Sequence, residues 1–319
     1  MNPAKIVFFH MNQIGDFLFS LPAMKTVKDR FPGIKIISVL RPELQVLAGC
    51  TDIIDDVFIR SRGIEGKVGL VNKLLSSRTE CVVTFSESPE CVILSALTGT
   101  RIRAGFASAS LAWVLNHKIT RVGPPSTENN LRLVESLLGC AAQKRDYTGM
   151  IKHQGSAKPW LTDFISKLVN KHVVILAPEV SLRRKHKKWL VERWASTAKK
   201  LVEEYNCAVV VVGTKNAVIE TQLIVSSSGV KDNVYNLAGK TSLIDLVYLL
   251  SNAGVYIGPD SGVMHMSAAM GLKCIALFGD TLPEHIGPQG VGHIIIKKSG
   301  MNEIEVNDVV TAFCSIFRV

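Results

Sequence analysis

Residues 258–271, GPDSGVMHMSAAMG, bring together residue types that can bind an anion. The stretch leads from an apolar segment into a helical pattern, and the first turn of a helix has unpaired N–H groups that favour negative charge. Asp260 or Ser261 can cap this helix, and Gly262 lets a ligand approach the backbone closely. His265 can donate to the same anion, although a packed histidine is the simpler interpretation when it is taken alone. The predicted phosphate-binding turn consists of Asp260, Ser261, Gly262, Val263, Met264 and His265.

A second candidate is a basic run between a predicted strand and a predicted amphipathic helix, SLRRKHKKW at residues 181–189. Every residue from Arg183 to Lys188 is Arg, Lys or His. Such a run is often a solvated loop or part of a nucleic-acid surface. Here it lacks interleaved aromatic residues, and no helix-turn-helix, RNA-recognition or zinc-finger spacing accompanies it. A diphosphate is therefore the more economical partner, and nucleic acid is not expected.

The third candidate is QIGD, residues 13–16, where the first predicted strand gives way to the first predicted helix. Gly15 and Asp16 then lie at the carboxyl end of a parallel strand, which is the edge that lines ligand clefts in open α/β sheets. The simplest role of Asp16 is to cap the helix. A carboxylate at this edge can also take a proton from an acceptor hydroxyl while a phosphorylated group leaves. The residues alone leave both roles open.

The elements that must position these groups follow an alternating pattern. Short β-branched runs alternate with helical patterns in both halves of the chain, which is typical of parallel sheets covered by helices on both faces. Strands are predicted at 5–10, 34–40, 81–88, 101–106, 172–178, 208–213, 255–258 and 274–279. Helices are predicted at 17–31, 90–99, 189–205, 242–254, 263–271 and 302–319.

The length of the chain indicates two domains. With 319 residues and 47% hydrophobic content, the chain exceeds what one core usually holds, so two domains of about 150 residues are expected. A polar stretch at 143–160, which contains Gly149, Gly155 and Pro159, predicts the linker. The predicted domains are therefore 1–155 and 156–319.

Charge and cysteine content restrict the class of protein further. The 37 Lys and Arg against 27 Asp and Glu give a net charge of +10, which suggests an anionic partner: nucleic acid, a phosphorylated metabolite or an acidic membrane. The seven cysteines are an odd number without a CxxC pair, so we expect buried thiols in a reducing cytoplasm. No apolar run approaches the ~18 residues of a membrane span. We expect a cytoplasmic protein that is soluble or peripheral at a membrane.

The chain resembles the bacterial heptosyltransferases of lipopolysaccharide core assembly, glycosyltransferase family nine. The resemblance implies an α/β protein of the GT-B fold, in which two Rossmann-like domains have parallel sheets that face each other across a cleft. It also implies that domain 1–155 binds the acceptor and that domain 156–319 binds the nucleotide-sugar donor. The segments that carry it are GDFLFSLPAMKTVKDRFPGIKI (15–36), KKWLVERWASTAKKL (187–201), LAGKTSLIDLVYLLSNAGVYIGPDSGVMHMSAAMGLKCIALFG (237–279) and GPQG (287–290).

By resemblance, the reaction is an inverting transfer of a heptose from ADP-heptose to a sugar hydroxyl of the lipopolysaccharide inner core. Asp16 is the implied general base and Lys187 the implied diphosphate lysine, with Lys185 and Lys188 as alternatives. We expect Lys187 to be a loop lysine that contributes little to a core. The implied donor-binding residues are Ser181, Lys187, Asp260, Ser261, Gly262, Val263, Met264 and His265.

The chain departs from the family pattern in two places. The long basic loop SLRRKHKK stands where the family usually has a Ser or Thr pair or a shorter loop, and Asp280 precedes Thr281 where the family commonly has Pro-Thr. No Asp-x-Asp triplet occurs in the sequence, so we expect neither a metal nor any cofactor besides the nucleotide sugar.

The acceptor side is less strongly indicated. Gly15, Arg60 and Arg62 could contact a lipid-linked oligosaccharide acceptor at the membrane. The two arginines belong to a basic surface that also includes Lys67, Arg101 and Arg103, although an ordinary solvated surface is an equally good interpretation. Two other functions compete with transfer. One is a nucleotide-sugar epimerase of the same two-domain plan, which would need no acceptor. The other is a non-catalytic protein that binds acidic glycolipid or nucleic acid.

Overall fold

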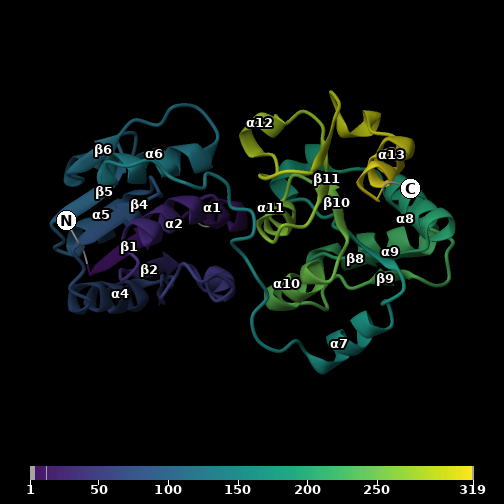
Figure 1. Cartoon of the computed structure of the whole chain (residues 1–319), viewed down its shortest axis with the longest axis horizontal. Helices are drawn as coiled ribbons and strands as arrows, with labels where there is room; N and C mark the ends of the chain where they lie inside the picture. The colour runs from purple at the N-terminus through teal and green to yellow at the C-terminus, as the bar shows by residue number, and fades with distance from the viewer. Residues whose placement is uncertain (1–3, 12, 318–319) are drawn as a thin grey trace. The chain divides into compact units, whose positions relative to one another are not determined.

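The computed structural model describes residues 4–11 and 13–317, and it forms two compact units that divide between Met150 and Ile151 (Figure 1). We call them unit 1 and unit 2. The division falls inside the polar stretch predicted as the linker. Each unit contains a six-stranded, wholly parallel sheet with helices packed on it, so the prediction of two Rossmann-like α/β domains is confirmed. The cleft between their sheets stays a prediction.

The sheet of unit 1 has the strand order β3-β2-β1-β4-β5-β6. The chain builds outward from β1 to one side and then returns to build from β4 to the other side. Such a reversal creates a switch point beside β1, and ligands of open α/β sheets bind at the carboxyl ends of the strands there. The strands are β1 (Lys5–Phe9), β2 (Lys35–Leu40), β3 (Asp56–Ile59), β4 (Cys81–Thr84), β5 (Ile102–Phe106) and β6 (His117–Ile119).

The helices of unit 1 lie on both faces of this sheet. On one face, Val7 and Phe9 of β1 pack against Leu70 and Leu74 of α4 and against residues of α5, because alternate residues of a strand point to the same side. A side-chain hydrogen bond of 3.1 Å from Asn130 to the carbonyl of Phe19 ties α6 to the turn between α1 and α2. The helices are α1 (Ile14–Leu18), α2 (Leu21–Arg30), α3 (Gln45–Ala48), α4 (Ile64–Ser76), α5 (Pro89–Leu97) and α6 (Ser126–Leu138).

The single helix predicted over 17–31 is wrong, because the structure has two helices there. α1 ends at Leu18 and α2 begins at Leu21, so that Pro22 falls in the first turn of α2. Proline fits that position, since an N–H group there would have no helical partner.

Unit 2 repeats the arrangement with the strand order β12-β11-β10-β7-β8-β9. Its large core cluster lies on one face of the sheet, because it takes alternate residues from each strand, and it includes Trp189, Trp194 and Phe313, all fully buried. Its strands are β7 (His172–Leu176), β8 (Cys207–Val211), β9 (Val234–Asn236), β10 (Val255–Pro259), β11 (Cys274–Phe278) and β12 (Ile294–Lys297). Its helices are α7 (Pro159–Ser166), α8 (Val191–Tyr205), α9 (Val218–Ser227), α10 (Leu243–Ser251), α11 (Gly262–Ala269), α12 (Pro283–Ile286) and α13 (Val306–Phe317).

Other predictions differ from the structure at the ends of elements. The C-terminal helix begins at Val306 rather than at residue 302, after a separate turn at Met301–Glu303, and residues 318–319 lie outside the described part of the chain. Five of the seven cysteines are buried as expected, whereas Cys140 and Cys314 are only partly covered. Within residues 4–11 and 13–317, no helix combines the length and the apolar composition that crossing a membrane requires.

Candidate functional site

The turn after β10 is held in one conformation by its own side chains. The hydroxyl of Tyr256 donates to the carbonyl of Pro259 at 3.2 Å and lies 3.1 Å from Oγ of Ser261. A Cβ atom added to Gly258 would lie 2.2 Å from the Tyr256 hydroxyl, so glycine is required at this close approach. The turn therefore delivers residues 260–265 in a fixed geometry at the carboxyl edge of the sheet.

Ser261, and not Asp260, caps the helix that follows. Its Oγ accepts a hydrogen bond of 3.3 Å from the backbone N–H of Met264. Gly262 and Val263 are the first two residues of α11, so their N–H groups precede the first intrahelical bond. These donors and the positive end of the helix dipole are suited to an anion.

Asp260, Lys187 and His265 form a buried charged cluster, which we call the Asp260 cluster. The ammonium of Lys187 donates to Oδ2 of Asp260, and Nε2 of His265 lies 3.6 Å from Oδ1. Burial alone would raise the pKa of Asp260, but its hydrogen bonds to His265 and Lys187 and their charges hold that pKa below its usual value. Asp260 is therefore an anion that fixes the direction of two cationic or donor groups.

The basic run before α8 separates into one buried and several exposed side chains. Lys187, the last residue of the 3-10 helix η3 (Leu182–Lys187), is only 3% exposed. The expectation that Lys187 is a loop lysine without a structural role is therefore wrong, because it is paired inside unit 2. Lys185 and Lys188 are both exposed, and Nζ of Lys188 lies 2.8 Å from Oε2 of Glu220. Ser181 is the N-cap of η3, and its Oγ accepts a hydrogen bond from the backbone N–H of Arg183. Its contact with the nucleotide sugar stays a prediction.

Asp16 in unit 1 lies inside the first turn of α1 rather than at its cap. The cap position is Gln13, and Asp16 is the third residue of the helix after Ile14 and Gly15. The interpretation of Asp16 as the N-cap is therefore wrong. Phe17 is fully buried beside it, while Asp16 itself is partly exposed, so the buried side chain of Phe17 anchors α1.

His10 is a residue of this region that sequence analysis missed. It follows β1, is 1% exposed, and joins three segments: its Nε2 lies 3.1 Å from Oγ of Ser38 on β2, and its Nδ1 lies 2.9 Å from Oγ of Ser20 in the turn between α1 and α2. Burial, and then the charge of Arg60, lower the pKa of His10 to about 3. The sequence gives one indication of this role, since His10 is a polar residue directly after an apolar strand. His10 acts as a neutral brace behind α1.

The low pKa of His10 makes the stability of unit 1 depend on pH. In the unfolded chain His10 binds a proton below its ordinary pKa of 6.5. In the folded chain it stays neutral down to about pH 3. Stability therefore falls as the pH falls through this window, by about 2 kcal/mol between pH 6.5 and pH 5. Urea unfolding followed by circular dichroism should show a flatter pH dependence for His10→Gln than for the wild type. The exposed His285→Gln is the control, and equal slopes for both variants would contradict the assignment.

A small basic cavity lies at the carboxyl ends of β2 and β3. It has a volume of about 150 Å³ and places four cationic side chains around one carboxylate. Arg60 is buried rather than part of a solvated surface, with Nη1 3.2 Å from Oε2 of Glu90, and Lys67 lies 3.1 Å from Oε1 of the same side chain. The excess of positive charge suits an anionic ligand. The cavity is lined by Arg41, Arg60, Ser61, Arg62, Gly63, Lys67 and Glu90.

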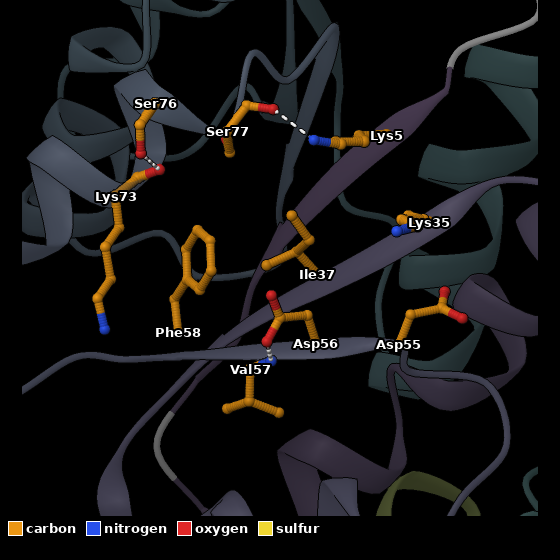
Figure 2. A pocket seen from close by; sticks show the side chains of 10 residues that line it. All are labelled: Lys5, Lys35, Ile37, Asp55, Asp56, Val57, Phe58, Lys73, Ser76 and Ser77. Carbon is orange, nitrogen blue, oxygen red and sulfur yellow. Dashed lines mark hydrogen bonds between the residues drawn. The ribbon is translucent and has the colours of Figure 1, made fainter.

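A larger cavity of about 540 Å³ lies at the opposite edge of the same sheet (Figure 2). Lys5 and Lys35 begin β1 and β2 there, facing the end of α4. Figure 2 shows two of its charged side chains bonded to backbone: Lys5 donates to the carbonyl of Ser77 at 3.0 Å, and Asp56 accepts from the N–H of Val57 at 2.8 Å. Because Asp16 and Arg60 lie at the carboxyl edge, this cavity is separate from the candidate site.

Comparison with known proteins identifies a family to which the chain is similar in sequence and solved structures that share its fold. A family described as glycosyltransferase family 9 (heptosyltransferase) matches residues 69–309, which is more than half of the chain and includes the Asp260 cluster but not Asp16. The chain is 23% identical over 291 residues to lipopolysaccharide heptosyltransferase 3 of Escherichia coli, covering 85% of this chain and 81% of that protein.

Two solved structures from E. coli are similar over nearly their whole length. One is ADP-heptose lipopolysaccharide heptosyltransferase II, with a TM-score of 0.82, 18% identity and 98% of both chains covered. The other is the heptosyltransferase WaaC with ADP, with a TM-score of 0.80, 17% identity, and 98% of this chain and 99% of that chain covered. At this level of identity the likeness establishes a common fold.

Proposed function

Because the chain belongs to glycosyltransferase family 9, the heptosyltransferases, we propose that it transfers a heptose from ADP-heptose to a sugar hydroxyl of the lipopolysaccharide inner core. The observation that carries the donor half of this proposal is the Asp260 cluster beside the first turn of α11, within the part of the chain that matches the family. The family match is to a transferase, so neither an epimerase nor a non-catalytic binding protein is favoured.

In the proposed donor site, unit 2 binds the diphosphate. The N–H groups of Gly262 and Val263 donate to phosphate oxygens, and Lys187 supplies a charge next to them. Asp260 holds the Lys187 ammonium in place, and His265 completes the cluster. As the bond to the sugar breaks, negative charge grows on the departing ADP, and these fixed positive groups stabilise it. The only small molecule required in unit 2 under this proposal is the nucleotide sugar itself.

In the proposed transfer step, Asp16 of unit 1 takes the proton from the acceptor hydroxyl. The oxygen attacks the anomeric carbon of the heptose as the bond from that carbon to the ADP oxygen breaks, which inverts the configuration at the carbon. Two observations support this role: Asp16 is partly exposed in the helix that follows the carboxyl end of β1, and the bond of His10 to Ser20 fixes the turn after that helix. A general base must reach the proton it removes, and the carboxyl edge of the sheet is where ligands bind.

The proposed acceptor is a lipid-linked oligosaccharide at the cytoplasmic face of the inner membrane. Arg41, Arg60, Arg62 and Lys67 surround the 150 Å³ cavity and provide an excess of positive charge for its phosphates or acidic sugars. Gly15 lies on the same edge of the sheet, one residue before Asp16. The decisive test is transfer itself: with donor and acceptor the protein should form a glycosidic bond, and with donor alone it should release no epimer.

We expect ADP to bind without added metal, with Lys187 and the first turn of α11 neutralising the diphosphate. Calorimetry with ADP should give the same dissociation constant with and without EDTA. In a thermal-shift comparison, ADP-heptose should raise the melting temperature more than UDP-GlcNAc or GDP-mannose. Loss of ADP binding in EDTA would refute the metal-free site, and equal shifts for all nucleotide sugars would argue against ADP-heptose as the donor.

A further inference from the structure

The exposed apolar side chains of unit 1 are concentrated on one layer of helices. Among its described residues, every exposed large apolar side chain except Val122 lies on α4, on α5 or beside the turn η2 (Ala112–Val114). None lies on α2 or α6. We call this surface the α4–α5 face. It consists of Ile64, Val68, Leu75, Ile93, Leu97, Leu111 and Trp113.

These elements cover the same side of the sheet. Leu70 of α4 and Leu94 of α5 belong to one core cluster, and Ala112 packs against the cluster that contains Val92 of α5. On α4 the exposed residues Ile64, Val68 and Leu75 follow at intervals of four and seven, which places them within about 40° of each other around the helix. The helix therefore presents a buried apolar stripe to the core and a second apolar stripe outward. Trp113, at 78% exposure, is an unusually open tryptophan.

Basic residues border the α4–α5 face. Lys67 and Lys73 are exposed on α4, Arg62 and Arg78 flank its two ends, and Arg101 follows α5. Exposed carboxylates along the same segment are fewer, at Glu65 and Glu80. The same α4 also borders the basic cavity through Lys67, so the apolar surface continues into the proposed acceptor side.

We propose that the α4–α5 face is the surface by which this protein docks on a membrane that contains anionic lipid. This inference rests on the proposed function, because a lipid-linked acceptor has to be met at a bilayer. An amphipathic surface with Trp, Ile and Leu beside Lys and Arg enters the boundary between headgroups and acyl chains, and the cations are attracted to acidic headgroups. Such a rim of positive charge disfavours a second copy of this chain, since like charges would face each other.

Sedimentation with vesicles tests the docking surface. The full chain should bind vesicles of phosphatidylcholine mixed with phosphatidylglycerol and should bind pure phosphatidylcholine vesicles much more weakly. Ile64→Ser should lower vesicle binding about tenfold, since burying such a side chain is worth roughly that factor. Ile219→Ser in unit 2 is the matched control, because Ile219 is 80% exposed and Ile64 is 82% exposed. Lys73→Gln should lower binding about fivefold.

Three outcomes would overturn the docking surface. They are the absence of wild-type binding to anionic vesicles, an equal loss of binding for Ile64→Ser and Ile219→Ser, and a stable dimer that Ile64→Ser dissociates. A lipid-free acceptor oligosaccharide separates this inference from the proposed function. Ile64→Ser should transfer heptose to that acceptor at the wild-type rate. If the wild type itself shows no transfer there, the proposed function fails while the vesicle result still decides the docking surface.

Discussion

Asp16→Asn is expected to slow heptose transfer by about 100- to 10,000-fold while the affinity for ADP stays unchanged. The amide is similar in size to the carboxylate but cannot accept the proton of the acceptor hydroxyl. The loss of a negative charge in the first turn of α1 should lower stability by about 1 kcal/mol at most. The buried Phe17 and Leu18 keep the helix in place. Initial rates with ADP-heptose and an inner-core acceptor, together with ADP calorimetry, measure both halves of the expectation.

Glu65→Gln is the matched control for this variant. Glu65 also lies in the first turn of a unit 1 helix, α4, so its replacement removes the same kind of favourable interaction with the helix dipole. It should leave transfer to a lipid-free acceptor unchanged. If Asp16→Asn keeps the wild-type rate, Asp16 is a structural residue and the general base must be sought among other groups at the carboxyl edge of the sheet.

Lys187→Met is expected to lower the free energy of unfolding of unit 2 by about 3 to 5 kcal/mol. The substitution leaves the buried carboxylate of Asp260 with two more distant partners, Nε2 of His265 at 3.6 Å and Nη1 of the exposed Arg184 at 4.0 Å. An uncompensated buried charge costs far more than a lost surface contact. Trp189 and Trp194 lie fully buried in the core of unit 2, so their fluorescence during denaturation reports the unfolding of this unit.

A double variant separates the structural role of Lys187 from its proposed role in binding. Lys187→Met with Asp260→Asn removes both charges, and it should recover most of the stability that Lys187→Met loses. It should not recover ADP binding, because the positive charge for the diphosphate is still missing. Wild-type stability in Lys187→Met would show that the buried pair does not stabilise the unit. Wild-type ADP affinity in the stable double variant would remove Lys187 from the donor site.

Local pattern predicted all eight inner strands of the two sheets and missed the four edge strands, β3, β6, β9 and β12. β1, β7 and β10 are continuous apolar runs because they are covered on both faces, which makes them easy to recognise. β6 and β9 are edge strands of only three residues, and the polar α6 buries Asn129 and Asn130, so neither length nor hydrophobicity indicated them. Only pairing with a neighbouring strand or helix defines such elements.

The candidate site shows the same limit. The capping turn at Ser261 follows from residue types a few positions apart, and it was predicted as one of two possibilities. The partnership of Lys187 with Asp260 joins residues 73 positions apart in the chain, and no local property distinguishes Lys187 from the exposed Lys185 or Lys188. His10 was missed for the same reason, since its bonds to Ser20 and Ser38 exist only once three segments have packed.

The division between Met150 and Ile151 makes this chain suitable for recombination. The large cores of the two units draw on separate sets of residues, so a crossover at this point would cut neither of them. Exchanging residues 151–319 for the corresponding half of another family member would therefore give a chimera in which both halves keep their own hydrophobic interiors. If the two units bind donor and acceptor as proposed, such hybrids could combine the sugar nucleotide of one family member with the glycan acceptor of another.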